Sequence, residues 1–499
     1  MTTDSAPARF GLRRTLGAVL GPAWLLATVI VPAPAALTPE AWLTAGIAGL
    51  MAAWWICETA PIPVTALLPI VLFPVFGLAG IRDVMPAYAD PIVFLFLGGF
   101  LLALAMQRTG LHRRIAFGLI GLLGLRPRRI IAGFLITAAL LSMWVSNTAT
   151  ALMMLPIATS VIGLVPEDEH GTPGNKAFAT ALMLAVAYGA TTGGMGTLIG
   201  TPPNALLAGF MARTYEITIG FGQWMMVGVP VVILTLPVVY LVLTRFAFRV
   251  GGEPMHRVGE LIARERARLG TFDGAERTVA VVFGLTALCW VSRPWLTELL
   301  PRLNDTTIAM AGAVILFLIP YRGRPGEFVM DWAAAKPVPW DVLLLFGGGL
   351  ALAGQIQSSG LSEWLGTGAA GLDGLPVVLI VGVLCFGILM LTELTSNTAT
   401  ATTFLPVVAA VAISLGQNPL LLLIPTALAA NCSYMMPVGT PPNAIVFGSG
   451  AVALPQMART GLWLNLLLVP LIVAVVWLLA PLVFGMEVDV LPSWATPAP

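Results

Sequence analysis

One short polar run occurs twice in this chain, each time inside a long apolar stretch. Ser-Asn-Thr-Ala-Thr fills residues 146–150 within the stretch at about 130–165, and it fills residues 396–400 within the stretch at about 375–415. In the first stretch each arm around the run has about 16 residues, too few to cross a hydrocarbon core of ~30 Å. Two short apolar arms that meet at a polar tip predict a re-entrant hairpin, so the sequence predicts two of them.

Other motifs repeat together with the hairpins. At the same shift of 250 residues, the segment 94–111 matches 344–361, including a Gly-Gly pair. Further on, Gly-Thr-Pro-Pro-Asn at 200–204 recurs at 439–443, a shift of 239 that an extra loop near residues 167–176 explains. Each copy would hold five crossings and one hairpin, and an odd number of crossings inverts the second copy. Such inverted repeats are typical of secondary transporters, whose site lies near the membrane midplane between the copies.

Composition places the chain in a lipid bilayer. Hydrophobic residues make up 58% of the 499 residues and charged residues only 10%, against roughly 25% charged in soluble proteins. The net charge of +1 provides no basic surface for a nucleic acid, so no nucleic-acid partner is expected. The four cysteines lie in or beside apolar segments without metal-ligand spacing, which argues against a disulfide framework or a zinc site.

A span needs about 20 apolar residues. Eleven segments meet this expectation, at roughly 15–33, 41–59, 62–80, 90–111, 177–211, 223–247, 278–300, 306–320, 341–360, 419–449 and 461–485. The segments at about 177–211 and 419–449 contain the Gly-Thr-Pro-Pro-Asn motif and are expected to be broken helices. The predicted fold is an all-α membrane protein with about eleven transmembrane helices and two re-entrant hairpins in an inverted repeat.

Charge bias predicts the orientation in the cell membrane. With a cytoplasmic N-terminus and an external C-terminus, 21 of the 25 Lys and Arg residues lie inside, as positive residues prefer. The four outside are Arg82, Arg213, Arg293 and Arg302. The first span follows Arg9, Arg13 and Arg14 and also resembles a secretory signal, but its apolar run of about 17 residues is long for one, so a retained helix is expected.

Four units are expected along the chain. They are an N-terminal segment with the first span (1–40), a first repeat (41–250), a cytoplasmic Arg-rich connection (251–277) and a second, inverted repeat (278–490). The composition of the connection fits an amphipathic helix on the membrane surface and fits a solvated loop equally well.

The polar tips supply the groups that a sodium ion accepts. Side-chain oxygens and the carbonyls of an unwound backbone together form an uncharged oxygen cage. Ser142 and Thr392 lie four residues before the two tip serines, on the same helical face, and would add one oxygen to each cage. Lone polar residues of these types usually join neighbouring helices, but their duplication at equivalent positions favours a binding role.

The two Thr-Pro-Pro motifs predict fresh helix starts inside membrane segments. Thr201 suits an N-cap and Pro202 the first helical position, and Thr440 and Pro441 repeat this arrangement. A helix start presents free N–H groups and the positive end of the helix dipole, which favours an anion. The alternative is a proline kink that eases packing. In the first copy the preceding helix is expected to be weakened by Gly189, Gly193, Gly194, Gly196 and Gly200.

These paired tips and breaks, with the run Leu391-Thr392-Glu393-Leu394-Thr395 before the second tip, resemble the divalent anion:sodium symporter family, whose members carry dicarboxylates, citrate or sulfate. The resemblance covers nearly the whole chain. It implies sodium-coupled symport of a small anion of the succinate, malate and fumarate class. It also implies a homodimer in the bilayer, in which a mobile transport domain moves against a static scaffold by an elevator mechanism.

The site residues of that family carry over onto matching positions. One sodium site would use Ser142, Ser146, Asn147 and Gly200, and the other Thr392, Ser396, Asn397 and Gly439. Two symmetric cages imply at least two sodium ions. The anion would contact Asn147, Thr148, Thr201, Pro202, Asn397, Thr398, Thr440 and Pro441.

Several alternatives stay open within this class. Some relatives are exchangers, so dicarboxylate antiport and sulfate transport remain possible on the same fold. A sodium/proton or arsenite antiporter would normally show a membrane Asp or a second carboxylate. Glu393 is the one carboxylate beside a tip, and a structural hydrogen-bonding role is favoured over a proton relay. No Lys or Arg is expected near either tip or either break.

Two other classes of function lack support in the sequence. An enzyme would need catalytic residues, but the three histidines fall in expected loops and neither an HExxH motif nor a membrane Asp pair is present. A channel would need a continuous polar lining, whereas the polar residues concentrate in two clusters.

Overall fold

The computed structural model describes residues 11–495, apart from residue 35 and residues 165–172, 252, 322–325, 369–370 and 372–373. The described segments are mostly helical and are joined by short loops. The predicted all-α class is confirmed.

The helices follow the order of the predicted segments. Up to the connection they are α1 (Leu12–Ile30), α2 (Pro39–Cys57), α3 (Ile62–Thr65), α4 (Leu68–Val75), α5 (Ile81–Tyr88), α6 (Pro91–Thr109), α7 (Leu111–Leu123), α8 (Pro127–Ser142), α9 (Asn147–Ile162), α10 (Pro173–Gly194), α11 (Pro202–Tyr215) and α12 (Phe221–Leu241), which continues as a π-helix, Val242–Ala247. The remainder are α13 (His256–Arg268), α14 (Gly274–Leu299), α15 (Asp305–Leu318), α16 (Trp332–Ala335), α17 (Trp340–Ser358), α18 (Leu361–Thr367), α19 (Val377–Thr392), α20 (Asn397–Ser414), α21 (Pro419–Asn431), α22 (Pro441–Gly448) and α23 (Leu454–Phe484).

Helix length bears on the predicted spans. Within the described segments, seven helices are long and apolar enough to cross a membrane, or up to eight if the bent pair α17 and α18 is one span. The expected span at 62–80 is an apolar helical segment, Ile62–Val75, shorter than predicted and divided into α3 and α4. Pro69 has no N–H to donate to the carbonyl of Thr65, which removes one helical hydrogen bond near this interruption. The total of eleven crossings remains a prediction.

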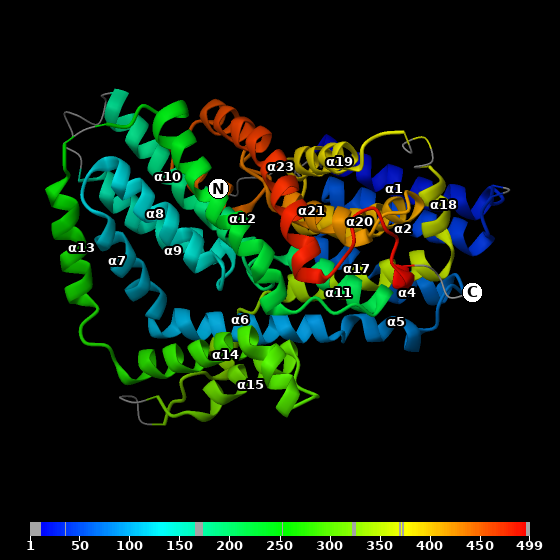
Figure 1. The fold of residues 1–499 in the computed structure, drawn as a ribbon, viewed down its shortest axis with the longest axis horizontal. Helices are drawn as coiled ribbons and strands as arrows, with labels where there is room; N and C mark the ends of the chain where they lie inside the picture. Colours follow the sequence, from blue (N-terminus) through cyan, green and yellow to red (C-terminus); the bar gives the residue numbers. More distant parts are fainter. Residues whose placement is uncertain are drawn as a thin grey trace, which may run out of the picture.

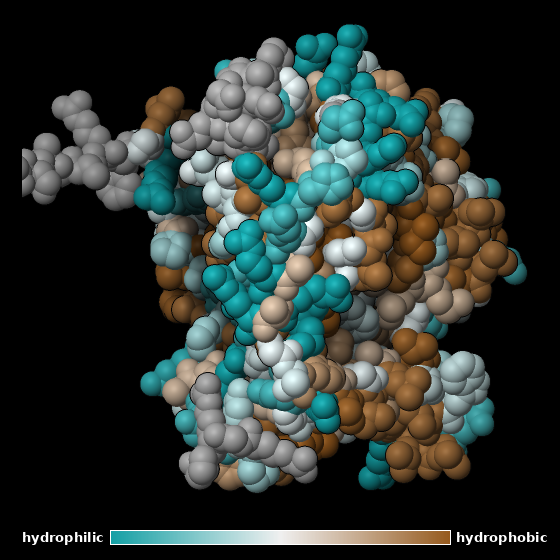
Figure 2. Space-filling view, turned by 90° about the vertical axis from the view of Figure 1, so that its left-hand side faces the viewer, coloured by the Kyte–Doolittle hydropathy of each residue, from teal (hydrophilic) through white to brown (hydrophobic). Residues whose placement is uncertain are grey.

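α6 and α14 run lengthwise along one side of the molecule, and α13 lies across one end (Figure 1). α6 packs against α14 and α15, and α13 packs on α7. α13 buries Val258 and Ile262, whereas Arg257, Arg264 and Arg266 are exposed. Figure 2 shows hydrophilic residues gathered over this end of the molecule. Of the two expectations for the connection, the structure thus has a helix with one buried apolar face, and its position at the membrane surface remains a prediction.

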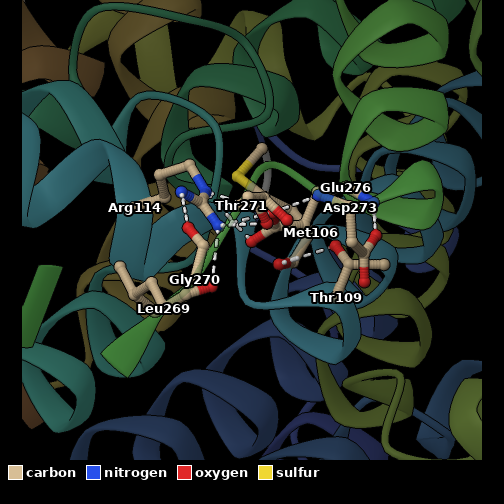
Figure 3. A network of polar contacts seen from close by, with 8 residues as sticks. All are labelled: Met106, Thr109, Arg114, Leu269, Gly270, Thr271, Asp273 and Glu276. Atoms are coloured by element: carbon tan, nitrogen blue, oxygen red, sulfur yellow. Dashed lines mark hydrogen bonds and ion pairs between the residues drawn. The ribbon is translucent and has the colours of Figure 1, made fainter. Parts of the chain in front are cut away.

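An arginine ties the start of α7 to the end of the connection (Figure 3). Arg114 Nη2 lies 2.8 Å from Glu276 Oε2, and Nε donates to both carboxylate oxygens at 3.1 and 3.2 Å. The same guanidinium donates to the carbonyls of Leu269, Gly270 and Thr271. Because carbonyls at a helix end lack partners within the helix, Arg114 stabilises the end of α13 and anchors α7 to it.

Two glycines turn the chain at equivalent points. Gly110 joins α6 to α7 with φ 80° and ψ 3°, and Gly360 joins α17 to α18 with φ 80° and ψ 4°. The second joint bends the chain by 75°. Left-handed backbone costs a residue with a Cβ atom about 1–2 kcal/mol, so glycine suits both joints. α7 and α18 thus each lead from a long helix to a hairpin.

Candidate ion and anion site

Two helix hairpins carry the polar tips, as predicted. α8 and α9 pack against α10, and α19 and α20 pack against α21. Glycines let α10 approach α8: an added Cβ would lie 2.1 Å from the Ala139 carbonyl oxygen at Gly193 and 2.5 Å from the Leu135 carbonyl oxygen at Gly189. These two glycines do not interrupt the helix, and the predicted break follows directly after them. α10 continues through both to Gly194, and the glycines allow close packing.

The first tip gathers oxygen atoms from three segments. One atom of the Asn147 side-chain amide lies 2.6 Å from Ser142 Oγ, 3.2 Å from the Ala190 carbonyl oxygen and 3.3 Å from the Gly200 carbonyl oxygen. With the amide nitrogen on this side, it donates hydrogen bonds to all three. With the amide oxygen on this side, four oxygens converge, an uncharged donor set that suits sodium. A half-turn of the amide interconverts the two arrangements.

The second tip repeats this pattern with related partners. Thr392 Oγ1 lies 2.8 Å from Asn397 Oδ1 and 2.9 Å from the Ala430 carbonyl oxygen. Thr392 is fully buried, as Ser142 is in the first tip. Gly439 lies against the backbone at Glu393, where an added Cβ would be 3.0 Å from the carbonyl oxygen. Hydroxyl, amide and carbonyl oxygens therefore meet at this tip too.

Equivalent asparagines hold the two unwound segments. Asn204 Nδ2 donates to the carbonyl oxygens of Gly194 at 3.1 Å and Thr197 at 2.8 Å. The matching asparagine, 239 residues later, makes the corresponding two contacts at 3.1 and 3.0 Å, from Asn443 Nδ2 to the carbonyl oxygens of Ser433 and Met436. A broken helix in a membrane leaves carbonyls without partners, and these buried amides satisfy them.

Thr201 and Thr440 start the two new helices with the same backbone. Both have φ −152°, with ψ 143° and 144°, and both precede a proline in the first turn, as predicted. Both threonines hold the predicted N-cap position, but neither hydroxyl makes a side-chain cap bond. Thr201 Oγ1 donates instead to Asn431 Oδ1 at 2.8 Å. The two prolines that open each helix have no N–H group, and the N–H groups of Asn204 and Asn443 donate to the Thr201 and Thr440 carbonyl oxygens at 3.3 and 3.1 Å.

Glu393 stabilises the second unwound segment. Five donors surround its carboxylate at 2.7–3.3 Å: the backbone N–H groups of Tyr434, Met435 and Met436, the Ser433 hydroxyl and the Asn465 side-chain amide. An ionised carboxylate is an acceptor on both oxygens, and these donors use both. The structure therefore supports the hydrogen-bonding role expected for Glu393.

One expectation about charge is wrong. Arg13 donates a hydrogen bond of 2.7 Å to the Leu394 carbonyl oxygen, two residues before Ser396 of the second tip. The same guanidinium contacts the Ile56 carbonyl oxygen and lies 3.8 Å from Glu58. α1 therefore brings a positive charge close to the exposed Leu394, beside this tip. Sequence distance concealed the contact, because Arg13 is 381 residues from Leu394.

The remaining predicted residues fall into three groups by exposure. Asn147, Thr148, Asn397, Thr398 and Pro202 are half-buried at the tips and the first break, Pro441 is exposed, and Thr201 and Thr440 are buried. Ser146 accepts from the Ala149 N–H at 3.3 Å and so caps α9, whereas Ser396 holds the N-cap position of α20 without a side-chain cap bond. Their roles in binding remain predictions.

Several contributing residues escaped the sequence reasoning. Ala190 and Ala430 act through carbonyl oxygens, which leave no side-chain signal. The run Asn431-Cys432-Ser433, with Pro437 and Gly439, is expected from the sequence to weaken the helix before the second break, but the contact of Asn431 with Thr201 was not predicted.

Comparison with known proteins decides the family. The sequence matches the family described as "Sodium:sulfate symporter transmembrane region" over residues 13–486. The chain belongs to this family. The resemblance seen in the sequence is thereby confirmed, and this member of the sodium:sulfate symporter family is a membrane transporter and not an enzyme.

Curated relatives align along almost the whole chain. The sodium-dependent dicarboxylate transporter SdcS of Staphylococcus saprophyticus is 42% identical over 486 residues, 96% of this chain and 94% of the relative. The protein of the same name from Staphylococcus aureus strain USA300 is 41% identical over 487 residues, with the same coverage.

Two solved structures share the fold of this family member at low sequence identity. Neisseria gonorrhoeae MtrF has a TM-score of 0.56 at 11% identity and covers 94% of this chain and 96% of its own. The Alcanivorax borkumensis YdaH transporter has a TM-score of 0.55 at 15% identity and covers 89% of this chain and 98% of its own.

Proposed function

We propose that the protein is a sodium-coupled symporter of di- or tricarboxylate anions, with succinate, malate and fumarate as the expected class. Relatives named sodium-dependent dicarboxylate transporters, 41–42% identical over 96% of the chain, support this substrate class. The two oxygen-rich tips support the sodium coupling.

The observation that carries the proposal is the Asn147 amide. A sodium ion would hold the amide oxygen toward Ser142 Oγ and the carbonyls of Ala190 and Gly200, at atoms that now lie 2.6–3.3 Å apart. Without the ion, the amide nitrogen bonds the same three atoms. In this proposal the Asn147 amide presents its oxygen to the ion when sodium is bound and its nitrogen to the same atoms when it is not.

Charge balance argues for at least two sodium ions per anion. The side chains that contact Asn147, Asn397 and Thr201 in the described structure are neutral. A dianion there would be balanced by bound sodium ions and by the N-termini of α9, α11, α20 and α22. A loaded site close to neutral crosses the hydrocarbon core at lower cost than a bare dianion does.

The anion would bind between the two tips. Its proposed contacts are Asn147, Thr148, Thr201, Pro202, Asn397, Thr398, Thr440 and Pro441. The second sodium would use Thr392, Ser396, Asn397 and Gly439, with the Ala430 carbonyl oxygen beside Thr392.

An elevator movement fits the arrangement of the helices. In the proposed cycle the hairpins move with α10, α11, α21 and α22 against a scaffold that includes α6, α14 and α15, in a homodimer. The halves 41–250 and 278–490 would be inverted repeats. α7 and α18 would act as arms, because each joins a long helix to a hairpin through a left-handed glycine.

Uptake by proteoliposomes tests this proposal. Labelled succinate, malate, citrate and sulfate are offered separately with an inward sodium gradient, with choline in its place, and with the vesicles preloaded with unlabelled anion. We expect succinate uptake that needs sodium and rises with a Hill coefficient above unity. Uptake that ignores sodium but follows an inward proton gradient, or that requires preloaded anion, would overturn the symport proposal; preference for sulfate would overturn the substrate class.

A further inference from the structure

Asn431 joins the two breaks from within the buried core. It ends α21 in the second half of the chain and is fully buried. Its Oδ1 accepts from Thr201 Oγ1 at 2.8 Å, and its Nδ2 donates to Asn204 Oδ1 at 2.9 Å and to the Ala427 carbonyl oxygen at 3.0 Å. Both N–H groups and the oxygen of the Asn431 side-chain amide therefore have hydrogen-bond partners. One side chain of the second half thus fixes two residues of the first Gly-Thr-Pro-Pro-Asn motif.

The neighbours of this contact reach both tips. Ala430 precedes Asn431, and its carbonyl oxygen lies 2.9 Å from Thr392 Oγ1 of the second tip. Gly200 precedes Thr201, and its carbonyl oxygen lies 3.3 Å from the Asn147 amide of the first tip. A path of two peptide links and three polar contacts therefore connects the Asn147 amide to Thr392.

We propose that Asn431 is a positioning residue that couples the two sodium sites. This inference rests on the proposed function, since it assumes that the two tips bind sodium. Asn431 itself contacts neither ion. It sets the position of the Thr201 hydroxyl, and through it the direction of the Gly200 carbonyl.

The coupling has a physical cause in the Thr392 hydroxyl. A sodium ion at the second tip takes a lone pair of Thr392 Oγ1, which polarises the O–H group and strengthens its bond to the Ala430 carbonyl. That bond holds the end of α21, and with it the Asn431 amide, in place to receive the Thr201 hydroxyl. Removing a group that orients a metal ligand in this way typically lowers the metal affinity by about 10- to 100-fold.

A second buried contact links the halves near the same place. Thr192, which lies 239 residues before Asn431, has its hydroxyl 2.9 Å from the Tyr434 hydroxyl. Tyr188 donates to the Tyr434 carbonyl oxygen at 2.8 Å. These contacts hold the two broken segments together without Asn431, so we expect its removal to loosen the path between the tips while the fold persists.

Sodium binding to the purified protein without anion isolates this coupling. The intrinsic tryptophan fluorescence and the melting temperature are followed against sodium concentration in wild type and in Asn431→Ala. We expect a Hill coefficient above unity in wild type and a value of unity in Asn431→Ala, with sodium affinity lower by about tenfold. Asn418→Ala is the matched control, because Asn418 is a buried asparagine at the other end of α21 that caps the Leu420 N–H.

A second pair of variants covers the case in which Asn431→Ala does not fold. Thr201→Val removes only the hydroxyl that Asn431 receives, and Thr201→Ser restores it. We expect Thr201→Val to lose cooperativity as Asn431→Ala does and Thr201→Ser to keep it. The coupling role is overturned if sodium binding stays cooperative in Asn431→Ala or in Thr201→Val. It is also overturned if Asn418→Ala loses cooperativity to the same extent. A wild type that binds no sodium would instead overturn the proposed function.

Discussion

Arg13 and Leu394 are 381 residues apart, yet the Arg13 guanidinium donates a hydrogen bond of 2.7 Å to the Leu394 carbonyl oxygen. The bond joins the first helix to the tip of the second hairpin. Since Arg13 also contacts the Ile56 carbonyl at the end of α2, a hairpin that moves relative to α2 must break one of the two contacts. The contact would therefore favour the conformation seen here.

Arg13→Ala should shift the balance of conformations during transport. The Arg13 side chain is 40% exposed, so we expect the bond to contribute about 1 kcal/mol or less. The maximal succinate uptake rate should change by up to about fivefold, while the sodium concentration for half-maximal uptake stays the same. Arg14→Ala, at the exposed neighbouring residue, is the control; equal rates in both variants would speak against the contact.

Alanine at either tip asparagine should impair transport without unfolding the protein. Asn147→Ala and Asn397→Ala each remove a half-buried amide that faces a hydroxyl at 2.6 or 2.8 Å. We expect sodium affinity to fall by about 10- to 100-fold, measured as the sodium dependence of uptake. Arg264→Ala should change little, because Arg264 is 67% exposed and 3.8 Å from Glu260. Normal uptake at low sodium in both asparagine variants would rule out the oxygen cages.

Glu393→Gln should weaken the second unwound segment. The substitution turns one acceptor oxygen into an NH₂ group that faces donors, which costs about 1–3 kcal/mol. We expect a lower melting temperature and weaker sodium affinity, with Glu363→Gln on the exposed face of α18 as the control. A variant of unchanged stability that loses a proton dependence of uptake would instead identify Glu393 as a proton relay.

The arm glycines should resist replacement by alanine. Gly110→Ala and Gly360→Ala have room for a methyl group, but at φ 80° the backbone would cost about 1–2 kcal/mol. We expect a lower melting temperature and slower uptake, because the strain falls on the joints of both arms. Gly118→Ala lies within α7 and also has open space for a Cβ atom; it should keep wild-type stability and uptake, and an equal loss there would contradict a special role for the joints.

Single cysteines test the inverted orientation. The positions best placed at the hairpin bases from sequence alone, Gly171 and Asp373, lie outside the described residues. Arg126, before α8, and Gly374, before α19, are exposed alternatives. In a background without the four native cysteines, Arg126→Cys should react with an impermeant maleimide from the cytoplasmic side and Gly374→Cys from the external side. Reaction of both from one side would contradict the inverted repeat.

Sequence alone predicted the helical class, the two interrupted hairpins and the two broken helices, because each rests on a local pattern. An apolar arm, a polar tip or a Pro-Pro pair is recognised from residues that lie close together in the sequence. The carbonyls of Ala190 and Ala430 and the bond from Arg13 to Leu394 could not be predicted in this way. They depend on which distant segments pack together, and a backbone carbonyl leaves no trace in residue identity.

The contact of Thr201 with Asn431 also bears on how the two halves came to depend on each other. The position matching Asn431 in the first half is Thr192, and the position matching Glu393 is Met143. A chimera made from two first halves would have neither the amide that receives Thr201 nor the carboxylate that holds residues 433–436. The matching positions of the two halves therefore carry different residues, and each half supplies contacts at the breaks that the other half lacks.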